Sequence, residues 1–204
     1  QRTEGKIQEA TSLYDQTIEI KKIRLGENHP SVAEAYINLA MARYGQGDAE
    51  ATLDLLGLAS SILGNPVSFI DVANAKEEQV IDYLHPTVAT IYHNVGYVYQ
   101  NTGKFSEAQS LFGLSAEILK RNLGPDHLSL AHVYQSMANL MFRNFHEHEA
   151  ALEMYDASLK IKSRNLRGRH ISIICTLQDI AYVLYTWVEN WKKLESSTNS
   201  QSTA

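Results

Sequence analysis

The sequence predicts an all-α protein, a solenoid of stacked antiparallel helix pairs. A loop phrase recurs, since "LGENHPSVA" at residues 25–33 returns as "LGPDHLSLA" at residues 123–131. Apolar residues three and four positions apart follow each copy, which is the spacing of an amphipathic helix. One pair of helices cannot bury its own apolar face, so several pairs must stack to build a continuous core.

Four histidines mark the period of the repeat. They are 56, 42 and 43 residues apart, and a hydroxyl residue follows each of them two positions later. These pairs are His29 and Ser31, His85 and Thr87, His127 and Ser129, and His170 and Ser172. We expect each hydroxyl to cap the following helix by accepting a backbone N–H, and Ser31 with Glu34 fits a capping box.

The expected helices come in pairs. The first helix of each pair carries a small residue at one fixed position, which lets a second helix approach closely: Ala40, Gly96, Ala138 and Ala181. Gly47 and Gly103 predict the turns that end the first two of these helices. Amphipathic segments of the second kind start near residues 9, 49, 107 and 150, so the repeating unit is an antiparallel helix pair.

Three segments carry a family resemblance: "LGENHPSVAEAYINLAMARYGQGD", "HPTVATIYHNVGYVYQNTGKFSEAQSLF" and "LGPDHLSLAHVYQSMANLMF". They resemble tetratricopeptide repeats (TPRs) of the longer, roughly 42-residue type found in kinesin light chains. The resemblance extends from about residue 5 to residue 195 and implies a right-handed superhelical TPR array with a protein-binding role. The sequence departs from the pattern at Leu128, at "LRGRHI" from residue 166, and at Phe145 and His146 near the usual turn glycine.

We expect one TPR array over residues 1–204, as a fragment of a longer protein. Residues 64–84 contain a 14-residue insertion, which we interpret as a surface excursion in which Asn65-Pro66 ends the preceding helix and "NAKEEQVIDYL" forms a short one. The expected parts are a second helix of an incomplete repeat (5–28), a repeat with the insertion (29–84), two repeats (85–126 and 127–169), an incomplete repeat (170–195) and a flexible tail (196–204).

Composition narrows the function classes. The chain has 18 Lys and Arg against 23 Asp and Glu, and a net charge of −5 gives no overall attraction for nucleic acid. No apolar run is expected to reach the roughly 18 to 20 residues of a membrane span, and the first ten residues do not resemble a secretory signal. Cys175 is the single cysteine, so an internal disulfide is impossible. We expect a cytoplasmic protein, with cytoskeletal association as a further expectation, and leave its oligomeric state open.

The sequence lacks signs of catalysis. It has no glycine-rich phosphate loop and no nucleophile elbow, so we expect a non-enzyme without cofactor or metal. Histidines on successive repeats cannot share one zinc ion, whose ligands lie about 2 Å away, so a structural role in the loop is expected for them. "HEHEA" at residues 146–150 is interpreted as a solvated turn, and Cys175 as a buried or bystander thiol.

Two groups of residues are candidate binding surfaces. The first is a stripe on the first helices of the pairs, which line the concave groove of a stacked array: Ile37, Met41, Tyr44, His93, Tyr97, Gln100, Asn101, Gln135, Asn139, Phe142, Arg143, Gln178 and Tyr182. The second is a candidate anion patch, with a solvated helix end as the alternative: Lys160, Lys162, Arg164, Arg167 and Arg169.

The stripe suits an extended peptide, because amides pair with a peptide backbone and rings supply contact area at low entropy cost. The predicted function is a non-catalytic adaptor that holds a linear peptide motif or a partner helix in this groove. The alternative is a structural spacer or scaffold segment of a cytoskeletal, ciliary or motor-associated complex, which binds through its edges or its insertion.

Overall fold

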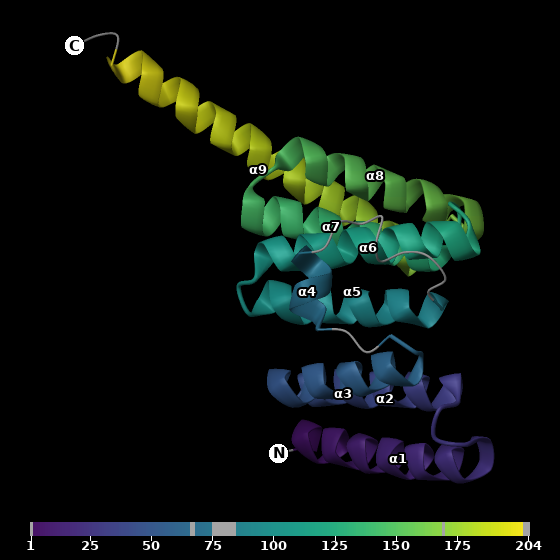
Figure 1. Ribbon diagram of the computed structural model, residues 1–204. Coiled ribbons are helices and arrows are strands. Elements are labelled where there is room, and N and C mark those ends of the chain that lie inside the picture. The colour runs from purple at the N-terminus through teal and green to yellow at the C-terminus, as the bar shows by residue number, and fades with distance from the viewer. Residues whose placement is uncertain (1, 66–67, 75–84, 169, 202–204) are drawn as a thin grey trace. The chain divides into compact units, whose positions relative to one another are not determined.

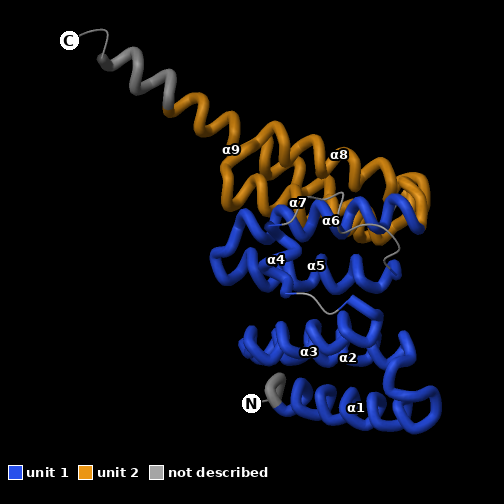
Figure 2. The backbone as a smooth tube through the Cα atoms, in the orientation of Figure 1, with its two compact units in different colours: residues 1–122 blue, residues 123–204 orange. Residues whose placement is uncertain are grey.

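The computed structural model describes residues 2–65, 68–74, 85–168 and 170–201, and every regular element within them is a helix. The chain forms two compact units, residues 1–122 and residues 123–204 (Figure 2). The elements are α1 (Arg2–Leu25), α2 (Pro30–Tyr44), α3 (Ala49–Ile62), α4 (Phe69–Asn74), α5 (Pro86–Asn101), α6 (Phe105–Leu123), α7 (Leu128–Leu140), the π-helix η2 (Met141–Phe145), α8 (His148–Asn165) and α9 (Ile171–Gln201). Consecutive helices pair as α2 with α3 and α7 with α8, and α5 pairs with α6 through Gly96 and Ser115 (Figure 1), which confirms the predicted all-α array.

Histidines, and not the hydroxyl residues, cap the first helix of each pair. His29, His85 and His127 are the N-caps of α2, α5 and α7, and His170 precedes α9 in the same way. In all four, the backbone N–H two residues later donates to the histidine Nδ1 at 3.2 Å. The expected hydroxyl caps are therefore wrong, and so is the capping box at Ser31, whose N–H is itself the capped group. The expected structural role of the histidines in the loop is confirmed.

The small residue in α5 brings its partner α6 very close. A Cβ atom added to Gly96 would lie 2.8 Å from Cε1 of Phe112 and 3.3 Å from the carbonyl oxygen of Ala108. Both distances are shorter than ordinary van der Waals contact, so a side chain at residue 96 would require the Phe112 ring to shift and would press on the Ala108 carbonyl. Gly96 therefore occupies the predicted close-approach position.

A hydroxyl group crosses the interface of each pair and binds a carbonyl of the first helix. The buried Ser115 hydroxyl of α6 donates to the Ala89 carbonyl of α5 at 2.7 Å. The buried Ser158 of α8 donates in the same way to the Ala131 carbonyl of α7, also at 2.7 Å. In the α2–α3 pair, the Thr52 hydroxyl lies 3.2 Å from the Ala40 carbonyl, but its closer acceptor is the Asp48 carbonyl just before its own helix, at 2.6 Å. The bonds of Ser115 and Ser158 satisfy buried hydroxyls and fix the axial positions of α6 and α8.

The described part of the insertion belongs to the core of the first unit, so its interpretation as a surface excursion is wrong there. The buried Asn65 donates from Nδ2 to the Tyr92 hydroxyl of α5 at 2.7 Å. Phe69 in α4 meets the same Tyr92 ring edge-on, with 6.5 Å between ring centroids. Val72, in the same short helix, is also buried. The expected short helix at residues 74–84 lies outside the described residues after Asn74.

The π-helix accounts for the extra residue between His127 and His170. These histidines are 43 residues apart, one more than His85 and His127. The wider π-turn of η2 takes up one residue, and His146 after it adopts a left-handed conformation with φ 60° and ψ 25°. In the α2–α3 and α5–α6 pairs, the equivalent turn residues are Gly47 and Gly103, each with φ of 85°. Phe145 and His146, where the sequence departs from the repeat pattern, thus form the turn without a glycine.

Helix α9 differs most from expectation. It runs without a turn to Gln201, so residues 196–201 are helical where a flexible tail was expected. Val188 stands where Gly103 ends α5, and a β-branched residue disfavours the positive φ of such a turn. Ala181 is exposed, although the equivalent Gly96 and Ala138 are buried. Within the described residues, Ile171–Lys193 contains an 18-residue window with a mean hydropathy of 1.4, so one helix is long and apolar enough by length and composition to cross a membrane, contrary to the expectation that none is.

A buried lysine links three helices of the second unit. Lys162 of α8 is 1% exposed, and its ammonium donates to the Gln135 side-chain oxygen of α7 and, at 2.8 Å, to the Thr176 hydroxyl of α9. Gln135 in turn donates from Nε2 to the Asp179 carboxylate of α9 at 2.9 Å. Burial lowers the pKa of the Lys162 ammonium, while Asp179 and Cys175 act in the opposite direction.

The close approach at Gly96 predicts a large difference between two glycine substitutions. Gly96→Ala should lower the free energy of unfolding by about 1 to 3 kcal/mol, because the new methyl group meets Phe112 and the Ala108 carbonyl. Gly57→Ala in α3, where an added Cβ meets nothing within 4 Å, should raise it by roughly 0.5 to 1 kcal/mol through helix propensity. Urea unfolding of both variants measures this, and equal changes would contradict the close approach.

The histidine cap predicts that His127→Ala lowers the free energy of unfolding by about 1 kcal/mol, because the Ser129 N–H loses its acceptor. His127→Asn should retain most of the stability, since an asparagine oxygen also accepts from the first turn. Thermal and urea unfolding of the two variants distinguish the cases. A wild-type-like alanine variant would show that the cap contributes nothing.

The buried lysine predicts a pH-dependent stability. The unfolded chain keeps the Lys162 proton up to its ordinary pKa of about 10.5, whereas the folded chain releases it at lower pH. The free energy of unfolding of the wild type, relative to Lys162→Met, should therefore rise as the pH approaches 10.5. Urea unfolding at a series of alkaline pH values tests this. Lys160→Met, at an exposed lysine of the same helix, serves as the control and should give no such trend.

Candidate peptide-binding surface

The predicted stripe of the first unit contains one exposed pair of rings. Tyr44 of α2 and Tyr97 of α5 meet edge-on, with 5.5 Å between ring centroids. Tyr97 is exposed and Tyr44 is half-buried, and this burial, helped by Tyr97, raises the pKa of the Tyr44 hydroxyl. His93 is half-buried and lies 5.5 Å from the Phe112 ring of α6. The rings of neighbouring pairs are therefore in contact along the stripe.

Other predicted residues of this unit are less accessible or already bonded. Ile37 is buried, and Met41 and Gln100 are half-buried. Asn101 is exposed and donates from Nδ2 to the Tyr97 carbonyl at 2.8 Å. The amides of α5 are thus partly used by their own helix, and the rings remain the main exposed contact area.

Sequence reasoning missed a shallow cavity between α2 and α5. It has a volume of about 290 Å³, and its lining includes the predicted Ile37 together with Glu34, Asn38, Thr87 and Thr90. Thr90 precedes His93 by three residues, so these positions continue the stripe by one helical turn toward the N-terminal ends of the helices. Extending the 3.6-residue period by one turn would have found them.

Gln135 and Asn139, two amides of the predicted stripe, bind other side chains within the second unit. Gln135 bridges Lys162 and Asp179, as described above. Asn139 accepts a hydrogen bond from the Tyr155 hydroxyl at 2.7 Å, and burial is the main cause that raises the pKa of that hydroxyl. Both amides therefore have internal partners and are poorly placed to pair with a peptide backbone. Arg143 and Gln178 are exposed.

Four rings form a continuous line across the second unit. Phe142 meets Tyr182 of α9 at 5.7 Å and His148 at 5.6 Å, both edge-on. His148 stacks on Trp187 of α9 with 6.0 Å between centroids and 23° between planes. We call these four residues the aromatic line. Phe142 and Tyr182 were predicted, whereas His148 and Trp187 were not.

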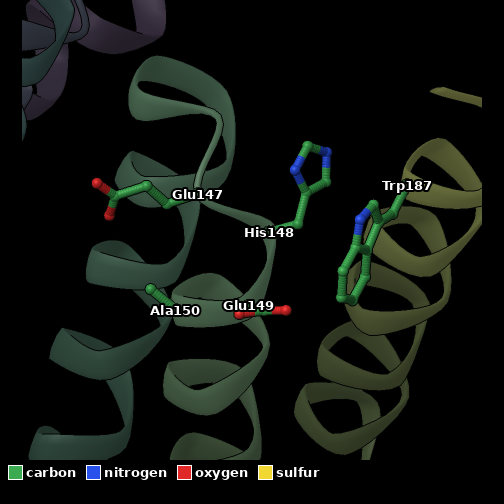
Figure 3. A pocket seen from close by; sticks show the side chains of 5 residues that line it. All are labelled: Glu147, His148, Glu149, Ala150 and Trp187. Atoms are coloured by element: carbon green, nitrogen blue, oxygen red, sulfur yellow. The ribbon is translucent and has the colours of Figure 1, made fainter. Parts of the chain in front are cut away.

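The aromatic line ends at a pocket of about 430 Å³, which is lined by Glu147, His148, Glu149, Ala150 and Trp187. Figure 3 shows His148 and Trp187 facing each other and the Glu149 carboxylate on the Trp187 side of α8, while Glu147 points the other way. The interpretation of "HEHEA" as a solvated turn is wrong for His148, which is half-buried between two rings. The Glu149 carboxylate beside an aromatic wall favours a cationic group with an apolar stem.

The predicted anion patch is not assembled as expected. Lys162 is buried, so it cannot belong to a surface patch. Lys160 pairs with Asp156, and Arg164 pairs with Asp126. Arg167 is exposed, and Arg169 lies outside the described residues. Cys175, expected to be a buried or bystander thiol, is exposed on α9.

Comparison with known proteins agrees with this architecture. Residues 87–163 and 2–31 each match a family model described as "Tetratricopeptide repeat", and together these ranges cover more than half of the chain. No curated protein sequence matches significantly.

Solved structures give the same fold. Two crystal structures of Podosopora anserina putative kinesin light chain nearly identical TPR-like repeats superpose with TM-scores of 0.63 and 0.61, at 21% and 22% identity. They cover 98% and 95% of this chain and 87% and 84% of theirs. BtubC (BKLC) from P. vanneervenii gives a TM-score of 0.68 at 21% identity, over 98% of this chain and 73% of that one. The chain belongs to the tetratricopeptide repeat family.

Proposed function

We propose that this protein is a non-catalytic adaptor that binds a linear peptide along the first helices of its pairs. Tetratricopeptide repeats serve in general as protein-interaction and scaffold modules, in which a stacked array presents an extended surface. The specific proposal is that the aromatic line and its pocket anchor a lysine or arginine side chain of the peptide.

The observation that carries this proposal is the pocket at the end of the aromatic line. Trp187 and His148 form its aromatic wall, and Glu149 supplies a carboxylate beside them. A lysine or arginine would place its aliphatic stem on the rings and its charge near the carboxylate. The second unit has as many Lys and Arg as Asp and Glu, eight of each, so the attraction for a basic side chain comes from Glu149 itself.

The surface is arranged before a ligand arrives. Each ring of the aromatic line rests on another ring, and Phe142 contacts two of them. Ordering costs on binding then fall mainly on the peptide, which favours measurable affinity from a small contact area.

The likeness to putative kinesin light chain repeats supports a second proposal, that the protein acts in the cytoplasm in association with the cytoskeleton. Imaging of a fluorescent fusion together with labelled microtubules and actin tests this. A fusion distributed evenly through the cell, without either filament, would contradict it.

Peptide selection on the purified protein tests the adaptor proposal. Selected peptides should be enriched in lysine or arginine, and Trp187→Ala should weaken binding of a selected peptide at least about tenfold, or ~1.4 kcal/mol, because the aromatic wall is lost. Isothermal titration calorimetry measures the change. Val188→Ala, at an exposed residue of the same helix outside the stripe and the pocket lining, is the control and should bind like the wild type. Enrichment of acidic peptides, or an unchanged Kd for Trp187→Ala, would contradict the proposal.

A further inference from the structure

One face of α9 is apolar and open to solvent. In α5, Gly96 and Tyr99 are buried toward α6, and Tyr92 on the same side of the helix is buried against Asn65 and Phe69. The equivalent residues of α9 are Leu177, which is 49% exposed, and Leu184, which is 45% exposed. Ala181, the equivalent of Gly96, is exposed as well. Helix α9 thus presents the surface on which the first helix of a pair normally receives its second helix.

Helix α1 presents the opposite surface. In α6, Leu111 and Ile118 face α5 and are fully buried. Their equivalents in α1 are Leu13 and Ile20, which are each 56% exposed. The other face of α1 packs on α2 through Ile18, which is buried. Helix α1 thus has the apolar face of a second helix, and the described residues of this chain leave that face open.

The two open faces match in register. Ala10 of α1 aligns with Ala108, which contacts the Gly96 position, and Ala181 of α9 aligns with Gly96. Thr17 of α1 aligns with Ser115, whose hydroxyl bonds the Ala89 carbonyl across the pair. At present the Thr17 hydroxyl donates to the Leu13 carbonyl of its own helix, at 2.8 Å.

We propose that α1 of a second copy of this chain docks on α9 and completes a helix pair. Ala10 of one copy faces Ala181 of the other, and the Thr17 hydroxyl transfers its hydrogen bond to the Ile174 carbonyl, the equivalent of Ala89. Leu13 and Ile20 cover Leu177 and Leu184. The contact continues the interface that already joins α5 to α6 and α7 to α8.

The structure favours a second copy over a lipid bilayer as the occupant. A membrane span needs apolar residues all around, whereas the opposite face of α9 is committed to its own unit. Ile173 and Val183 are buried there, Thr176 bonds Lys162, and Asp179 bonds Gln135. Inserting α9 into lipid would break these contacts and bring Asp179 into hydrocarbon. A docked helix covers only the open face and leaves all of them in place.

The contact is heterologous, because different surfaces of the two copies meet. Repeated use of it generates open chains or closed rings. Sedimentation equilibrium of the full chain, over a concentration series up to roughly 1 mM, should give a mass that rises above the 22.9 kDa of one copy. Ala181→Arg and Leu13→Glu should each stay monomeric, since each variant blocks one of the two surfaces at an exposed residue. Cys175→Arg is the control, because the equivalent Thr90 remains exposed although α6 covers α5.

Mixing the two variants gives the decisive result. Ala181→Arg keeps a functional α1 and Leu13→Glu keeps a functional α9, so their mixture should form a dimer, twice the mass of either alone, and nothing larger. A dimer of either variant by itself would show a symmetric contact and overturn the proposal. A wild type that is monomeric throughout the series would also overturn it, as would wild-type binding to phosphatidylcholine vesicles that Ala181→Arg abolishes while no self-association is seen.

Disulfide trapping checks the register. In a Cys175→Ser background, Ala10→Cys and Ala181→Cys chains should cross-link when they are mixed and mildly oxidised, because the equivalent residues of α5 and α6 are in contact. Asp15→Cys, at an exposed residue away from the apolar face of α1, should not cross-link with Ala181→Cys. Equal cross-linking of the Ala10 and Asp15 positions would overturn the proposed register.

Discussion

The close contact within each helix pair is the constraint on which the rest of the structure depends. In the pair α5–α6, Gly96 sets the distance between the helices, and the hydrogen bond from Ser115 to the Ala89 carbonyl sets their axial position. The same hydroxyl-to-carbonyl bond joins α7 and α8. Once the distance between the helices and their axial position are fixed, each residue on the inner face of the first helix has a defined neighbour. The residues of that helix without such a neighbour form the exposed stripe.

The periodicity of the sequence was sufficient to predict the helices and their pairing, because apolar spacing and a recurrent small residue state directly which faces must meet. It assigned the caps incorrectly, since serine and threonine are the more common N-caps and stand close to the helix start. A better signal was available at His29 and His85. The proline after each favours the first helical position, which makes the preceding histidine the cap. No proline follows His127, so its role as a cap can be predicted only from its equivalence to His29 and His85 in the repeat.

The candidate site was less predictable than the fold. The helical period identifies which face of α7 is turned outward, but not what neighbouring helices require of it. Gln135 is taken by the buried Lys162, and Asn139 by the hydroxyl of Tyr155. Lys162 and Tyr155 are each more than ten positions away in the sequence from the amide that they bind. Trp187 was missed for a related reason, because its role depends on α9 continuing as a helix past the position at which Gly103 ends α5.

Helix α9 has three faces that differ in their surroundings. One face packs within its unit through Ile173 and Val183, and a second carries the exposed Leu177, Ala181 and Leu184. The ring of Tyr182 lies to one side of that second face, against Phe142. The residues proposed to bind a peptide and those proposed to receive a second copy are therefore different, although they share one helix. Because the two sets do not overlap, loss of self-association and loss of peptide binding are separable outcomes, and each proposal stands or fails on its own residues.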